Sequence, residues 1–233
     1  PFHRPILPKS LDEIYSDSIK NGWLTTGAQV RFFEKKLIEY LLYKKVFVLN
    51  SCTAGLHLAL AAKGFKKGYK FLVPTLTFVS TIECGEYVDM EPVLVDCAKN
   101  GFLFDLNYME EQIKKDHKIK AVIPMHYGGE LCDMKHIISI AEKYGVFVLE
   151  DAAHALETSI NKNKDGYLNH AVAFSFYANK NITSAGEGGA LATNNDSLAR
   201  KVKKLSLHGI TKDGWDRFKD FGKWEYDITE LGF

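Results

Sequence analysis

Short apolar runs rich in β-branched and aromatic residues alternate along the chain with longer segments of helical spacing. This alternation is typical of a sheet covered by helices on both faces. Seven of the short runs have the length and composition of strands: Lys45–Leu49, Phe71–Pro74, Pro92–Asp96, Ala121–Met125, Val146–Glu150, Ala171–Phe176 and Gly189–Thr193. The sequence therefore predicts an α/β fold.

Helix signals occupy several of the gaps between these runs. Ser10 is followed three residues later by Glu13, a capping-box spacing that predicts the start of a helix. The segments Asp133–Lys143 and Asp196–Leu205 also have helical spacing. Residues 161–166 have the composition of a surface turn, which we expect to separate two strands rather than two domains.

Composition narrows the class of protein. The 233 residues are 46% hydrophobic, which is enough for one large domain. A net charge of +1 argues against binding to nucleic acid or to an anionic membrane, and the apolar runs are far shorter than the roughly 20 residues of a membrane-spanning helix. The four cysteines lack metal-ligand spacing, so we expect reduced thiols in a cytoplasmic protein.

The first segment that could carry chemistry is residues 50–55, which follow a predicted strand and lead into the helix-forming run Leu56–Ala62. The free N–H groups and the dipole at a helix start favour a bound phosphate. An ordinary helix cap by Ser51 or Thr53 explains the same residues. The sequence alone leaves both interpretations open.

The second segment is Val146–His154, a predicted strand that ends in two acids and then a histidine. Ligands in open α/β sheets gather at the carboxyl ends of strands. A carboxylate held there can pair with a cationic ring nitrogen, and Asp151 is the candidate. The alternatives are that Asp151 caps the next segment and that His154 has no special role.

The third segment is residues 174–183, in which Lys180 follows a hydrophobic strand among aromatic and small residues. Desolvation makes a lysine easier to deprotonate, so that it can act as an imine-forming amine. A solvated surface lysine is the alternative. The glycines at 186, 188 and 189 either form a tight turn or allow close approach of the backbone to a ligand.

Other candidates are weaker. Phe78, after the predicted strand Phe71–Pro74, could lie against a planar ring, and residues 124–129 end a further strand. Neither a serine-hydrolase order of residues nor a His-Glu-x-x-His helix occurs in the sequence. We therefore expect no metal site and no serine-hydrolase chemistry.

Taken in order, these segments resemble the DegT/DnrJ/StrS family of pyridoxal phosphate (PLP) dependent sugar aminotransferases. The likeness covers essentially the whole chain and is carried by residues 21–27, 49–57, 74–81, 150–155 and 174–189. It implies a three-layer α/β/α sandwich with a mostly parallel seven-stranded sheet, the large domain of a PLP-dependent transferase. Departures are Glu83, where the family commonly has Asn, and residues 157–158, where a glycine is usual.

The resemblance also implies a set of residues around the cofactor. The ligands of the phosphate would be Thr53, Ala54 and Ser175. The contacts of the ring would be Phe78, which stacks on it, Asp151, which pairs with its nitrogen, and His154, which lies beside it. Lys180 would carry PLP as a Schiff base, so the expected catalytic residues are Lys180 and Asp151.

The family's reaction moves an amino group from an amino acid, such as glutamate, to a keto group of a nucleotide-linked sugar. The resemblance implies this reaction and a homodimer whose active sites are shared between subunits. Residues 214–217, 224–226 and 230–233 resemble the approach to a segment that reaches the partner's site. We therefore expect a smaller C-terminal domain beyond the present sequence, in preference to trimmed termini.

Two other functions have to be weighed. PLP-dependent sugar dehydratases share the fold but have a histidine in place of the lysine, so Lys180 argues against that class. A PLP-binding module without turnover is the alternative outside enzymology, and a generic nucleotide-binding α/β domain is the least specific one.

Overall fold

The computed structural model describes residues 6, 8–156, 169–210 and 226–233. The departure at 157–158, the expected turn at 161–166 and the segments 214–217 and 224–225 lie outside these residues. The helices are α1 Leu11–Lys20, α2 Ala28–Leu41, α3 Cys52–Lys63, α4 Ser80–Glu86, α5 Leu106–Lys115, α6 Met134–Tyr144 and α7 Asp196–Leu205, with a 3₁₀ helix at Tyr127–Gly129. Within the described ranges, no helix combines the length and apolar character needed to cross a membrane.

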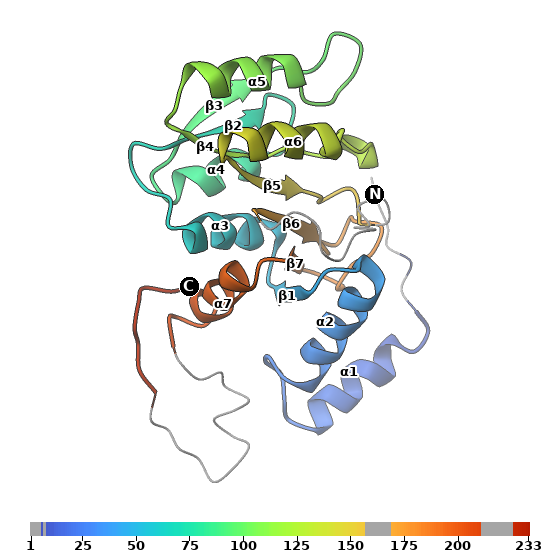
Figure 1. Cartoon of the computed structure of the whole chain (residues 1–233). Coiled ribbons are helices and arrows are strands. Elements are labelled where there is room, and N and C mark those ends of the chain that lie inside the picture. The colour runs from blue at the N-terminus through green and yellow to red at the C-terminus, as the bar shows by residue number, and fades with distance from the viewer. Residues whose placement is uncertain (1–5, 7, 157–168, 211–225) are drawn as a thin grey trace.

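A single sheet of seven strands forms the centre of the molecule (Figure 1). Its strands are β1 Lys45–Leu49, β2 Lys70–Pro74, β3 Glu91–Val95, β4 Ile119–Val122, β5 Phe147–Asp151, β6 His170–Ser175 and β7 Gly189–Thr193. The spatial order is β1-β7-β6-β5-β4-β2-β3, and β7 runs antiparallel to both of its neighbours. The expected α/β fold with a mostly parallel seven-stranded sheet is confirmed.

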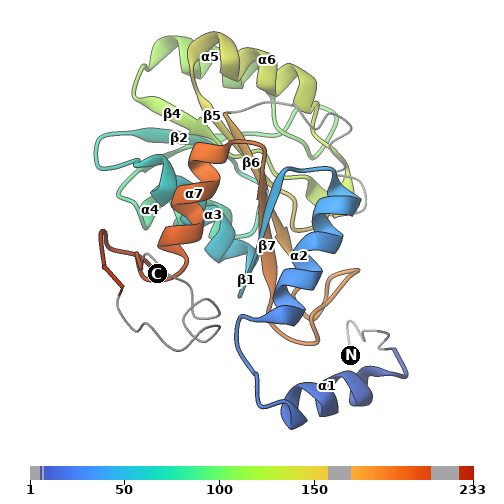
Figure 2. The ribbon, with the colours of Figure 1, turned by 60° about the horizontal axis from the view of Figure 1, so that its bottom comes forward.

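Helices cover both faces of this sheet. Alternate strand residues such as Phe147 and Leu149 pack against α3, α4 and α7, whereas Val146 and Val148 pack against α5 and α6. The second face also carries α2, which packs on Val172 and Phe174 of β6. Figure 2 shows α7 and α2 on opposite sides of β1 and β7. The three-layer α/β/α arrangement expected from the sequence is therefore present.

The strand ends differ from expectation by a few residues, most clearly at β4. The sequence predicted a strand over Ala121–Met125, but the regular pairing of β4 ends at Val122. Pro124 has no N–H to donate to a ladder, and its carbonyl instead accepts from the amide of Asp151 at 2.9 Å. This bond and an isolated bridge between Met125 and Asp151 keep the chain beside β5 after the strand has ended.

Side-chain caps fix the starts of several helices. Ser51, Asp105, Asp133 and Asn195 each accept a backbone N–H of the first turn that follows them. Ser10 does precede α1, but its side chain makes no cap hydrogen bond, so the capping box predicted with Glu13 is wrong in this respect. The helix is in the predicted place without that cap.

Candidate active site

One cavity of about 630 Å³ lies at the carboxyl ends of β2, β5 and β6, next to the start of α3. The structure brings six of the residues expected from the sequence to its wall: Thr53, Phe78, Asp151, His154, Ser175 and Lys180. A second, smaller space of about 260 Å³ shares Ser175, His154 and Lys180 with it. Segments that are more than a hundred residues apart in the chain therefore meet in one place.

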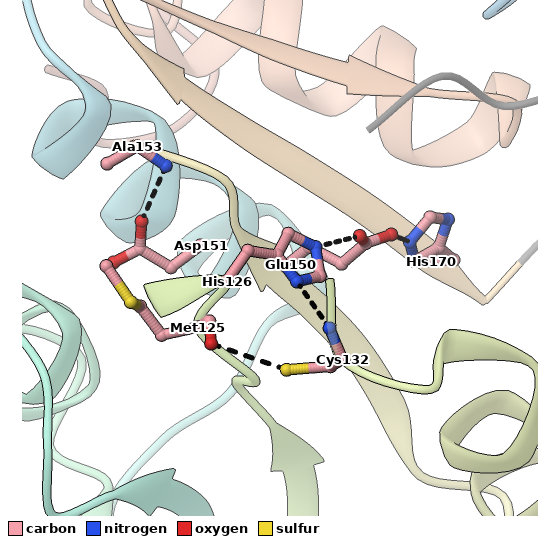
Figure 3. Close-up of polar contacts among 7 residues, drawn as sticks. All are labelled: Met125, His126, Cys132, Glu150, Asp151, Ala153 and His170. Carbon is pink, nitrogen blue, oxygen red and sulfur yellow. Dashed lines mark hydrogen bonds and ion pairs between the residues drawn. The ribbon is translucent and has the colours of Figure 1, made fainter. Parts of the chain in front are cut away.

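Asp151 is the buried acid of this cavity, with 2% of its surface exposed. Its Oδ1 accepts the N–H of Ala153 at 3.0 Å, and Oδ2 accepts the hydroxyl of Thr81 at 2.6 Å (Figure 3 shows the Ala153 bond). Sγ of Cys52 lies 3.9 Å from Oδ1. A carboxylate buried this deeply needs such hydrogen-bond donors.

The thiol of Cys52 keeps its proton in this setting. Burial, followed by the negative charge of Asp151, raises the pKa of Cys52 well above its usual range. Cys84, which lies in α4, also has a raised pKa because of burial and then Asp151. Both cysteines are therefore neutral and unsuited to act as nucleophiles.

The start of α3 offers backbone donors to the cavity. Ser51 caps the helix by accepting the N–H of Ala54 at 3.0 Å, so the cap interpretation holds for Ser51. The N–H groups of Cys52 and Thr53, in the first turn, have no acceptor within the helix. Ala54 itself lines a neighbouring cavity of about 650 Å³ rather than the one that holds Asp151.

Gly189 explains how the start of α3 is held at this position. A Cβ atom at Gly189 would lie 2.3 Å from the carbonyl carbon of Ser51 and 2.4 Å from the amide nitrogen of Cys52. The close approach at Gly189 is therefore to the backbone of the helix start, not to a ligand as one of the two interpretations of the sequence had it. A Cβ at Gly186, in contrast, meets no atom within 4 Å.

Lys180 is carried by a turn that follows β6. Its amide donates to the carbonyl of Tyr177 at 2.9 Å, and Tyr177 in turn bridges to Gly186. The amide of Tyr177 donates to the hydroxyl of Ser175 at 3.3 Å. These contacts order the turn, so that the Lys180 amine and the Ser175 hydroxyl both reach the cavity.

The imidazole of His154 is fixed by the 3₁₀ helix. Its Nδ1 accepts the N–H of Gly128 at 3.2 Å, which leaves the ring proton on Nε2. Burial and then the positive charge of Lys180 lower the pKa of His154, so the ring is neutral at pH 7. Tyr127 packs edge-on against the ring with centroids 6.2 Å apart.

A buried polar cluster adjoins the site on the other face of β5 (Figure 3). Glu150 accepts from Nε2 of His126 at 2.6 Å and is also bonded to His170. Nδ1 of His126 accepts the N–H of Cys132 at 3.2 Å. Burial alone would raise the pKa of Glu150, but His170 and His126 lower it to about 2.

A family model matches residues 7–229, that is, almost the whole chain. The chain belongs to the DegT/DnrJ/EryC1/StrS aminotransferase family. The spore coat polysaccharide biosynthesis protein SpsC of Bacillus subtilis is 39% identical over 233 residues, which are all of this chain and 59% of that relative. The chain thus spans about three fifths of the length of the curated relatives it matches.

Solved structures agree with this membership. A putative sugar aminotransferase from Streptococcus pneumoniae, in its PMP form, superposes with a TM-score of 0.87 at 29% identity over all of this chain and 63% of that one. Helicobacter pylori PseC, an aminotransferase involved in the biosynthesis of pseudoaminic acid, gives a TM-score of 0.86 at 27% identity over all of this chain and 60% of its own.

Several groups around the site of this family member were not singled out from the sequence. Thr81 and Cys52 contact Asp151, and His126 and His170 hold the neighbouring Glu150. Thr81 lies 70 positions before Asp151, and no local pattern joins the two residues. Only the fold brings them together, although a threonine pair at 77 and 81 has the spacing of one helical turn.

Proposed function

We propose that this chain is the PLP-binding domain of an aminotransferase that moves an amino group from an amino acid to a keto group of a nucleotide-linked sugar. The observation that carries the proposal is that a buried, hydrogen-bonded carboxylate, a lysine amine and a helix start face one cavity. These three groups match the three chemical features of PLP: a basic ring nitrogen, an aldehyde and a phosphate.

The phosphate is assigned to the start of α3. The free amides there, the hydroxyl of Thr53 and the hydroxyl of Ser175 would bind its oxygens, and the helix dipole adds to the attraction. Ala54 belongs to the same turn, but its amide already donates to Ser51. We therefore propose that Ala54 lies close to the phosphate as part of this turn, without donating its N–H to it.

The ring is assigned to the space between Phe78 and His154. Phe78 is 70% exposed in the described residues, so its face is available for stacking on a planar ring. The Asp151 carboxylate would accept a hydrogen bond from the protonated ring nitrogen, and its negative charge would keep that nitrogen protonated. His154, as a neutral imidazole with its proton on Nε2, would lie beside the ring without adding charge.

Lys180 has two tasks in this proposal. Its amine would hold the cofactor covalently in the resting enzyme, and as a free amine it would carry a proton to and from the substrate carbon. PLP, when bound, supplies an electron sink for the carbanion character that develops at the substrate. The chain's own contribution is to hold the amine, the carboxylate and the phosphate donors in fixed relative positions.

The substrate class is supported by the relatives. SpsC is named for spore coat polysaccharide biosynthesis, and PseC for the biosynthesis of pseudoaminic acid. We propose glutamate as the amino donor and a nucleotide-linked keto sugar as the acceptor. We also propose that residues 1–233 correspond to the large domain of these longer relatives, and that the protein works as a cytoplasmic homodimer with shared sites.

An absorbance spectrum of the purified protein with PLP, before and after borohydride reduction, followed by peptide mapping, tests the proposal. The reduced adduct should map to Lys180, and glutamate should convert bound PLP to its amine form. A protein that binds PLP at Lys180 without this conversion would be the PLP-binding module instead. Absence of PLP binding would contradict the proposed function and favour a generic nucleotide-binding domain.

A further inference from the structure

Two threonines, Thr77 just before α4 and Thr81 in its first turn, connect to the Asp151 carboxylate. Oγ1 of Thr81 lies 2.6 Å from Oδ2 of Asp151, and Oγ1 of Thr77 lies 2.7 Å from Oγ1 of Thr81. Thr81 is fully buried, whereas Thr77 lines the 630 Å³ cavity. The two hydroxyls therefore connect the wall of the cavity with the carboxylate.

The hydrogen bonds in this chain have a fixed direction. An ionised carboxylate can only accept, and each hydroxyl has one proton to donate. Thr81 must therefore give its proton to Asp151, and Thr77 must give its proton to Thr81. A hydroxyl that donates to an anion while accepting from another hydroxyl makes a short and well-oriented bond.

The two carboxylate oxygens of Asp151 accept different numbers of hydrogen bonds. Oδ1 accepts from both Ala153 and Cys52, whereas Oδ2 accepts from Thr81. A carboxylate oxygen offers about two acceptor positions. Among the residues that the structure describes, one acceptor position thus remains on Oδ2, the oxygen that Thr81 orients.

We propose that Thr81 is a positioning residue, whose hydroxyl fixes the Asp151 carboxylate so that Oδ2 receives the ring nitrogen of PLP. The inference rests on the proposed function, because it assigns Asp151 to the ring nitrogen. Thr81 itself is buried behind Asp151 and acts through it. A carboxylate that is already oriented loses less freedom when the cofactor binds, so the effect should appear in cofactor affinity as well as in turnover.

The first test replaces Thr81 with valine, which has nearly the same shape but no hydroxyl, and with serine, which keeps the hydroxyl. The dissociation constant for PLP is measured by fluorescence titration without any amino donor, and kcat and KM for glutamate are measured separately. We expect Thr81→Val to raise the PLP dissociation constant about tenfold, the size expected for one lost hydrogen bond to a charged group. Thr81→Val should also lower kcat more than it raises KM for glutamate. Thr81→Ser, which keeps the hydroxyl, should have a PLP dissociation constant and a kcat near those of the wild type.

Thr193→Val is the matched control. Thr193 is also a fully buried threonine, and its hydroxyl donates to the carbonyl of His170 at 2.7 Å, away from the cavity. This variant loses an equivalent buried hydrogen bond, so it should lose thermal stability while it binds PLP as tightly as the wild type does. An equal loss of PLP affinity in both valine variants would overturn the positioning role.

A crystal structure of the wild-type holoenzyme gives a second measurement that does not depend on how well Thr81→Val folds. The ring nitrogen should lie within hydrogen-bond distance of Oδ2 of Asp151, and a contact to Oδ1 alone would overturn the inference. Unchanged PLP affinity in Thr81→Val would overturn this inference and leave the proposed function standing. A wild-type protein that binds no PLP would overturn both.

Discussion

Glu150 and Asp151 are consecutive residues of β5, and their carboxylates lie on opposite faces of the sheet. Asp151 contacts Thr81 of α4 and Cys52 of α3, whereas Glu150 lies between the imidazoles of His126 and His170. Successive side chains of a strand alternate between faces, so this separation follows directly from their adjacency. The two acids should consequently respond to mutation in different ways.

Asp151→Asn should impair function more than stability. The amide occupies nearly the same volume but has no negative charge to offer a cationic ring nitrogen. We expect turnover to fall by about a hundredfold or more, in line with the loss of a preorganised charged contact. Steady-state kinetics with saturating PLP measure this, and turnover within a few-fold of wild type would contradict the assignment.

Glu150→Gln should impair stability instead. The change leaves two buried imidazoles without their carboxylate, and we expect a loss of about 3 kcal/mol in the free energy of unfolding. Urea unfolding measures it, and Glu39→Gln, which affects an exposed ion pair with Lys36, should change little. A Glu150→Gln variant as stable as the wild type would show that the Glu150 carboxylate makes no net contribution to the free energy of unfolding.

The same cluster gives a pH dependence with a definite sign. The folded pKa of Glu150 is lowered from 4.5 to about 2. Its ionised form therefore contributes stability that is fully present above pH 4.5 and is lost as the pH falls toward 2. The difference in unfolding free energy between the wild type and Glu150→Gln should thus narrow over that range.

Lys180→Ala should abolish covalent attachment of PLP, because the variant has no amine at this position. The absorbance band of the bound cofactor and its fixation by borohydride should both be lost. Lys66→Ala, a change of an exposed lysine, is the control and should behave as the wild type does. Labelling that persists in Lys180→Ala would mean that another lysine carries the cofactor.

Gly189→Ala should displace the start of α3. The new Cβ would overlap the backbone of Ser51 and Cys52, which cannot move aside as a flexible side chain can. We expect a loss of about 1–3 kcal/mol in stability and weaker binding of PLP. Gly186→Ala meets open space and is the matched control, so equal behaviour of the two variants in thermal melts and PLP titrations would contradict the steric argument.

The titration of His154 tests the electrostatics of the site without any cofactor. Its ring should titrate below 6.5, because burial and then the charge of Lys180 lower its pKa. Removing that charge in Lys180→Ala should move the midpoint upward. NMR of the ring protons measures both values, with His154→Gln to assign the signal, and an unchanged midpoint in Lys180→Ala would mean that the two groups are not coupled.

The parts of the fold that the sequence predicted well are those with strong local signals. β1, β7 and α7 have the predicted bounds, because each is a short apolar run or a capped amphipathic segment. β4 ended early because Pro124 interrupts the ladder, and the capping box at Ser10 did not form. The local sequence pattern thus predicts the positions of helices and strands better than the residues at which they end or the hydrogen bonds that cap them.

Some residues of the candidate site could likewise be predicted from the sequence, and others could not. Asp151 could be singled out because it lies at the carboxyl end of a predicted strand, and these ends share an edge of the sheet. Ser175 was expected only from the family resemblance. Thr81 and His170 could not be singled out, because their contacts to β5 depend on how distant helices and strands pack. Ala54 lies at the expected helix start but faces a different cavity, since side-chain direction within a helical turn depends on the exact start of the helix.

The place of β7 has a consequence for how the protein is made. β1 lies at the edge of the sheet beside β7, and the amide of Lys44 donates to Asn194, 150 residues further along the chain. During translation, β1 can therefore pair with its neighbour in the sheet only after β7 has left the ribosome. The start of α3, which follows β1, makes its contact with Gly189 only after that. Binding of PLP should therefore come late in the synthesis and folding of the chain.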